Sequence, residues 1–109
     1  MANRIEQARA AVDACIREAY LRAVAAGELP EGAEIRGSVE QPKDTANGDF
    51  AANHAMASAK TMHMAPRKIA EVLIAHMELG GSWFSGVEAA GPGFLNFRLS
   101  DKWYQDVLS

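Results

Sequence analysis

Two segments with alternating side-chain character flank the tripeptide Gly91-Pro92-Gly93, which has the composition of a tight turn. From Phe94 to Leu99, apolar side chains occupy every second position, as in a β-strand with one buried face. A weaker pattern from Trp83 to Ala90 predicts the partner strand. Because a β-hairpin must bury its apolar face against another layer, this chain needs helices or further strands beside it.

The stretch before the hairpin predicts one long helix and one short strand. Between residues 3 and 26, apolar residues recur every three to five positions, which places them on one face of a helix. Gly27 has the position of a C-terminal cap, and Pro30 prevents continuation. The alternation from Ile35 to Glu40 is typical of a short, half-buried strand.

Three more helices are predicted around the hairpin. The first runs from Phe50 to about Met62, is rich in alanine, and has Asp49 as its expected N-cap. The second begins at Pro66, which suits the first helical position, and extends to Gly80-Gly81. The third follows Ser100, a second expected N-cap, and runs to the last residue.

This order of elements predicts an α+β fold. We expect a small, mostly antiparallel sheet of three or four strands, packed in two layers with about four helices. A chain of 109 residues has the usual size of one domain, so residues 1–109 are predicted to form a single core. Because the last predicted helix has no stop signal before Ser109, we expect this domain to be part of a longer protein.

The charge of the chain limits how it can bind nucleic acid. It carries 11 basic and 14 acidic side chains, a formal net charge of −3. Domains that hold nucleic acid mainly by neutralising phosphates are strongly basic, so we expect no DNA partner and only a few placed contacts to any RNA. The sequence has neither an apolar run of about 20 residues nor a signal-peptide pattern, which predicts a cytoplasmic protein without a membrane partner.

The strand after the turn carries the strongest candidate site. Its period places Phe94, Asn96 and Arg98 on the face opposite the apolar one. An aromatic ring can stack on an unpaired base, an amide can donate to and accept from its edge, and a guanidinium can stack or reach a phosphate. The simpler interpretation is that a helix covers Phe94 and that the two polar side chains are ordinary solvated surface.

Other reactive side chains give weaker signals. The segment Met62-His63-Met64 resembles a soft-metal cluster, but a helix end with core methionines is the favoured interpretation, and no metal site is predicted. His54 and His76 lie on separate predicted helices. Cys15 is the single cysteine, which excludes an internal disulfide and favours a buried small side chain. No phosphate-binding loop, nucleophile elbow or zinc-protease motif is present.

Several motifs together resemble the N-terminal domain of arginyl-tRNA synthetases. They occur in the expected order over most of the chain: Asn47-Gly48-Asp49-Phe50-Ala51-Ala52-Asn53, Ala55-Met56, Pro66-Arg67-Lys68-Ile69-Ala70, and Val87-Glu88-Ala89-Ala90-Gly91-Pro92-Gly93-Phe94-Leu95-Asn96-Phe97-Arg98-Leu99. The resemblance implies an appended domain without catalytic residues or cofactor of its own, which binds the D-loop corner of tRNA(Arg).

The resemblance also assigns roles to individual residues. It implies that Phe94 and Asn96 hold one D-loop nucleotide, by stacking and by edge hydrogen bonds, and Arg98 completes the expected site. Gly91 offers no side chain for reading the base, and His54 replaces an aliphatic residue of the family. The implied parent is a class I aminoacyl-tRNA ligase that uses ATP and magnesium, with a catalytic domain in the same chain beyond Ser109.

Two other functions remain open. The chain could be a protein-interaction module that docks a partner through its alanine-rich and C-terminal helices. It could also be a small stand-alone enzyme, although no nucleophile or acid–base pair is evident. The resemblance favours tRNA recognition over both.

Overall fold

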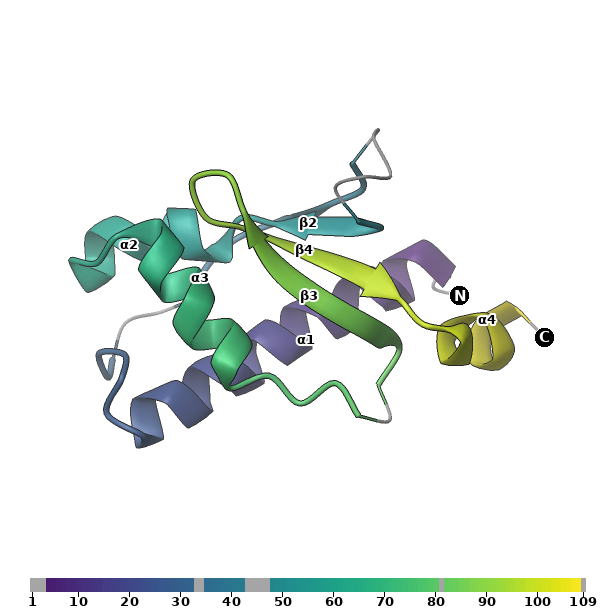
Figure 1. The fold of residues 1–109 in the computed structure, drawn as a ribbon, viewed down its shortest axis with the longest axis horizontal. Coiled ribbons are helices and arrows are strands. Elements are labelled where there is room, and N and C mark those ends of the chain that lie inside the picture. Colours follow the sequence, from purple (N-terminus) through teal and green to yellow (C-terminus); the bar gives the residue numbers. More distant parts are fainter. Residues whose placement is uncertain (1–3, 33–34, 43–47, 81, 109) are drawn as a thin grey trace.

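The computed structural model describes residues 4–32, 35–42, 48–80 and 82–108. Figure 1 shows the elements in the following order along the chain: α1 (Arg4–Ala25), β1 (Val39–Glu40), β2 (Phe50–Ala52), α2 (His54–Met62), α3 (Pro66–Ala75), β3 (Phe84–Ala90), β4 (Phe94–Leu99) and α4 (Asp101–Leu108). The strands form one antiparallel sheet in the order β1-β2-β4-β3. The predicted α+β class is therefore confirmed.

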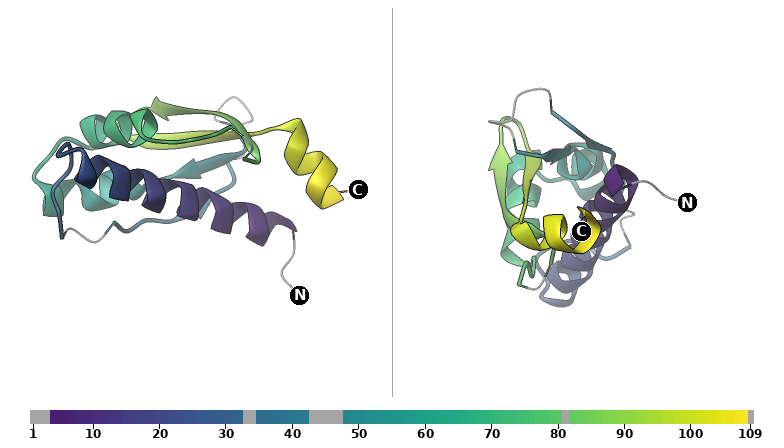
Figure 2. Two further views of the ribbon diagram at one scale, coloured as in Figure 1. Left: turned by 90° about the horizontal axis from the view of Figure 1, so that it is seen from below. Right: turned by 90° about the vertical axis from the view of Figure 1, so that its right-hand side faces the viewer.

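The core lies between the sheet and α1, which runs beneath it, while α2 and α3 lie at one end of α1 and α4 at the other (Figures 1 and 2). The fully buried side chains of β2 and β4 are Phe50, Ala52, Leu95 and Phe97. They pack against Val12 and Ile16 of α1 and Ile69 and Leu73 of α3 in one cluster. One face of the sheet is thus apolar and covered.

The predicted helix from Phe50 to Met62 is wrong in its first turn. Residues 50–52 form β2, which pairs with β1 and β4, and the helix begins at His54. Asp49 does not cap it: its Oδ2 accepts a hydrogen bond from the Leu99 amide at 2.8 Å. Pairing with two strands and burial of Phe50 outweigh the helical preference of the alanines.

The predicted strand from Ile35 to Glu40 is shorter than expected. Only Val39 and Glu40 pair with β2. Before them, the Ser38 amide donates to Asn53 Oδ1 at 2.7 Å, and the Ser38 carbonyl accepts from the Asn53 amide at 3.2 Å. These bonds attach the segment to the start of α2, where Gly37 passes so close to His54 that a Cβ would lie 2.6 Å from the imidazole ring.

Two predicted helix ends also differ from the structure. The helix that starts at Pro66 ends at Ala75, before Gly80, and the next carbonyl, that of His76, accepts a hydrogen bond from Arg22 of α1 at 2.8 Å. Ser100 precedes α4 as expected, but its hydroxyl is buried without a partner among the described residues. Its carbonyl accepts from the Trp103 amide at 3.1 Å instead.

Candidate functional site

The face of the sheet away from α1 carries a row of aligned side chains. Glu40 of β1 is opposite Ala51 of β2, Ala51 is opposite Asn96 of β4, and Asn96 is opposite Glu88 of β3. Directly opposed residues of antiparallel strands project from the same face. Phe94 lies two residues from Asn96 on β4 and shares this face.

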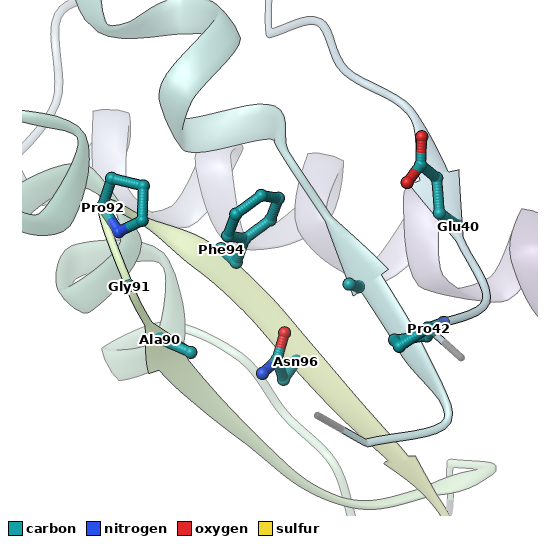
Figure 3. Close-up of a pocket in the computed structure, with 8 residues that line it drawn as sticks. Glu40, Pro42, Ala90, Gly91, Pro92, Phe94 and Asn96 are labelled. Carbon is teal, nitrogen blue, oxygen red and sulfur yellow. The ribbon is translucent and has the colours of Figure 1, made fainter. Parts of the chain in front are cut away.

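A pocket of about 340 Å³ opens on this face. Its volume lies near the lower end of the range for small-molecule sites, about 300–1,000 Å³. Figure 3 shows the residues that line it: Glu40, Pro42, Ala51, Ala90, Gly91, Pro92, Phe94 and Asn96. The pocket thus joins all four strands and the hairpin turn.

Phe94 and Asn96 supply the two kinds of contact that an unpaired base requires. Phe94 is 37% exposed, so other elements do not cover its ring completely. Asn96 is only 4% exposed, yet it lines the pocket, and no described residue forms a hydrogen bond with its amide. A buried amide without a protein partner gains a partner when a ligand with a polar edge enters the pocket.

Ala51 forms the floor of the pocket between Glu40 and Asn96. A larger side chain here would fill the space between them, because adjacent strands are only about 4.8 Å apart. The sequence reasoning missed this role because it placed Ala51 in a helix. The signal was present in Phe50-Ala51-Ala52, since Phe50 and Ala52 face the core and Ala51 does not, which is the period of a strand.

The hairpin turn forms one wall of the pocket and is fixed by the start of α3. Gly93 has a φ of 140°, and a Cβ there would lie 2.8 Å from the Cβ of Pro66. Arg67 donates from Nη1 to the Gly91 carbonyl at 3.1 Å. The turn that presents Pro92 to the pocket is therefore held by packing and a hydrogen bond from the first residues of α3.

The structure brings two of the three predicted site residues together. Phe94 and Asn96 share the pocket, whereas Arg98 lies further along the same face and does not line it. The Arg98 guanidinium is 3.5 Å from the Glu88 carboxylate, and its side chain is 48% exposed. Arg98 is thus placed at the edge of the site, beside one of the two carboxylates in the cross-strand row.

Two of the three histidines contact carboxylates of the same domain. His54 is fully buried, and its Nε2 lies 2.9 Å from Asp13 Oδ1. Burial raises the pKa of Asp13, but hydrogen bonds from His54 and Arg17 outweigh this effect and hold the pKa below its ordinary value. His76 contacts Glu28 at 2.8 Å.

The other candidate groups from the sequence, the Met62-His63 segment and Cys15, have positions typical of structural residues. Met62 is buried, and His63 ends α2 in the left-handed conformation. Cys15 is half-buried against the core, and burial raises the pKa of its thiol. Within the described ranges, no three His, Cys, Asp or Glu side chains form a metal-binding group, and no helix is long and apolar enough to span a bilayer.

Several arginine–tRNA ligases of bacteria have similar sequences. The ligase of Acetivibrio thermocellus is 41% identical over 108 residues, covering 99% of this chain and 19% of that protein. The ligase of Rhodospirillum rubrum is 44% identical over 98 residues, covering 85% of this chain and 16% of that protein. The chain therefore spans about a fifth of the length of the curated relatives that it matches.

Solved structures and a family model agree with these relatives. Thermus thermophilus arginyl-tRNA synthetase aligns with a TM-score of 0.66 and 26% identity over 86% of this chain and 14% of its own. The Plasmodium falciparum enzyme aligns with a TM-score of 0.71 over 92% and 17%, and at 14% identity this likeness concerns the fold alone. The model of the arginyl tRNA synthetase N terminal domain matches residues 6–99. The chain belongs to this family of arginyl-tRNA synthetase N-terminal domains.

Proposed function

We propose that this chain is the tRNA-recognition domain of an arginine–tRNA ligase, and that its pocket holds one unpaired base from the D-loop of tRNA(Arg). The observation that carries the proposal is the presence of the exposed Phe94 and the buried side-chain amide of Asn96 in one pocket. Activation of arginine with ATP and magnesium belongs to a catalytic domain of the same chain, in a cytoplasmic enzyme of protein biosynthesis.

The chemistry of the pocket suits a base better than a phosphate. Single-stranded RNA is recognised by stacking of splayed bases on aromatic rings and by hydrogen bonds to their edges. Phe94 supplies the ring, and Asn96 supplies both a donor and an acceptor. Among the described lining residues the charged one is Glu40, a carboxylate, which disfavours an anionic ligand.

This role is compatible with the acidic composition. Phosphate contacts supply affinity and position, whereas base contacts supply discrimination. A domain with a net charge of −3 contributes little phosphate neutralisation, so its part is to read one base while other domains hold the backbone. We therefore expect weak binding of tRNA by these residues in isolation.

The proposed interaction of α2 with a partner protein has less structural support. Ala55 and Ser58 of this helix are buried inside the domain, so these two small side chains already serve internal packing. The exposed aromatic ring and the buried amide line the pocket on the sheet instead.

Kinetics of the full-length enzyme test the proposed function. Phe94→Ala is expected to lower kcat/KM for tRNA(Arg) by about 1–3 kcal/mol in transition-state stabilisation, the usual value of one base–aromatic stack. The KM for arginine should stay unchanged. Leu21→Ala is the matched control, because Leu21 is also a large exposed apolar residue, 65% exposed on α1. Equal kcat/KM values for the wild type and Phe94→Ala would contradict the proposal.

A further inference from the structure

The pocket has a second polar wall that faces Asn96 across Ala51. Glu40 is two strands away from Asn96 in the same cross-strand row, which places their backbones about 10 Å apart. Both side chains line the pocket (Figure 3), and the strand register places the small Ala51 between them. An object held between them contacts an amide on one edge and a carboxylate on the other.

We propose that Glu40 is a specificity-determining residue, which selects an unpaired base with an exocyclic amino group and disfavours uracil. This inference rests on the proposed function, since it concerns the base that Phe94 and Asn96 hold.

The selection follows from the hydrogen-bond acceptors that line the pocket, above all the Glu40 carboxylate. An ionised carboxylate only accepts hydrogen bonds, and the amide oxygen of Asn96 is a further acceptor. Adenine, cytosine and guanine each carry an amino group on the Watson–Crick edge, which can donate to these acceptors. Uracil has one N–H between two carbonyl oxygens, so a Glu40 carboxylate that accepts from this N–H is repelled by the carbonyl oxygens beside it. Hydrogen bonds to a charged acceptor are stronger than neutral ones, and an unmatched one is correspondingly costly.

The other carboxylate of the same row is placed differently. Glu88 is opposite Asn96 on β3, but it does not line the pocket, and it lies 3.5 Å from the Arg98 guanidinium. No described residue forms an ion pair with Glu40. Glu40 and Glu88 thus have the same charge and lie on the same face of the sheet, but only Glu40 lines the pocket. Glu88→Gln is therefore a matched control for Glu40→Gln.

The experiment uses the full-length enzyme and tRNA(Arg) transcripts in which each unpaired D-loop nucleotide is varied in turn. At the position that contacts the pocket, adenosine or guanosine is compared with purine riboside or inosine, which lack the amino group, and cytidine is compared with uridine. Binding is measured for the wild type, Glu40→Gln and Glu88→Gln. A glutamine side chain can rotate to donate or accept, so it removes the excess of acceptors with little change in volume.

The wild type is expected to prefer the amino-bearing base by about 5- to 150-fold, the range for one wrongly matched base contact. Glu40→Gln should reduce this preference to within about threefold, and Glu88→Gln should retain it. The inference is overturned if Glu40→Gln retains the preference, or if the wild type has none. In either case a loss of binding in Phe94→Ala leaves the proposed function standing, whereas unchanged binding in Phe94→Ala removes both.

Discussion

Leu95 and Phe97 on one face of β4 are fully buried against the helices, while on the other face Phe94 remains 37% exposed beside Asn96. These residues alternate along six positions of one strand. The buried face gains its free energy from removal of apolar surface from water and from edge-to-face packing of Phe97 on Phe84, whose ring centroids are 5.1 Å apart. The open face contributes little to this core.

The contrast between the two faces of β4 shows that one short strand can stabilise the fold with one face and form a binding site with the other. The side chains that determine stability and those that form the pocket project in opposite directions, so each set can be altered with little effect on the other. The hairpin turn is the exception, because Gly91 and Pro92 line the pocket while Gly93 packs on Pro66 in the helical layer. Substitutions on the buried face, at the turn and on the open face can therefore test this division separately, from the largest expected effect to the smallest.

The largest effect is expected on the buried face. Phe97→Ala removes a fully buried ring and leaves a cavity, so the free energy of unfolding should fall by about 3–5 kcal/mol. Denaturant titration followed by circular dichroism measures this loss. A loss below about 1 kcal/mol would show that the two faces of β4 are not divided as described.

A smaller effect on both folding and recognition is expected at the turn. Gly93→Ala places a Cβ at 2.8 Å from Pro66 at a φ of 140°, so it should cost about 1–3 kcal/mol in stability and also weaken tRNA binding by displacing the pocket wall. Gly86→Ala in β3 is the control, because nothing lies within 4 Å of its added Cβ. Thermal unfolding measures the stability of both variants, and titration with tRNA measures their binding. Equal behaviour of the two would contradict the packing of the turn.

On the open face, Phe94→Ala is expected to change the free energy of unfolding by no more than about 1 kcal/mol, because its ring is incompletely buried. The same substitution should lower tRNA recognition, as described above. A denaturation curve recorded beside the kinetic assay separates the two quantities. If the free energy of unfolding falls as far as in Phe97→Ala, the loss of tRNA recognition has a structural cause, and the claim that the open face contributes little to stability is contradicted.

The smallest effect concerns the polar contact between α1 and α2. The pKa of Asp13 is depressed in the folded state, so its carboxylate stabilises the fold above the ordinary pKa of 3.8, and this contribution is lost as the pH falls through the folded value. Asp13→Asn should therefore be less stable than the wild type at pH 7, and the difference should shrink below about pH 4. Urea titrations across this range measure it. A difference that is constant with pH would exclude the linkage.

The sequence predicted those parts of the fold that depend on local patterns. The 22 residues of α1, the hairpin and the alternation that places Phe94 and Asn96 together all follow from side-chain periodicity. These features depend on residues close in sequence, so pattern and turn chemistry suffice to identify them.

The parts that the sequence did not predict depend on distant pairing. Residues 50–52 became a strand because β4 lies beside them, although alanine favours helices. As a result, the roles of Ala51 and Glu40 in the pocket could not be predicted, since both follow from the register of β1, β2 and β4. Arg98 lies on the same face but outside the pocket lining, with its guanidinium 3.5 Å from Glu88, and its part in binding tRNA stays a prediction.

The most direct test of base recognition is a double-mutant cycle between Phe94→Ala and an abasic D-loop nucleotide in the full-length enzyme. If the ring stacks on that base, removal of either partner weakens tRNA binding, and removal of both costs little more than one, with a coupling energy of about 1–3 kcal/mol. Additive losses at every unpaired D-loop position would contradict the central claim that Phe94 and Asn96 hold one of those bases.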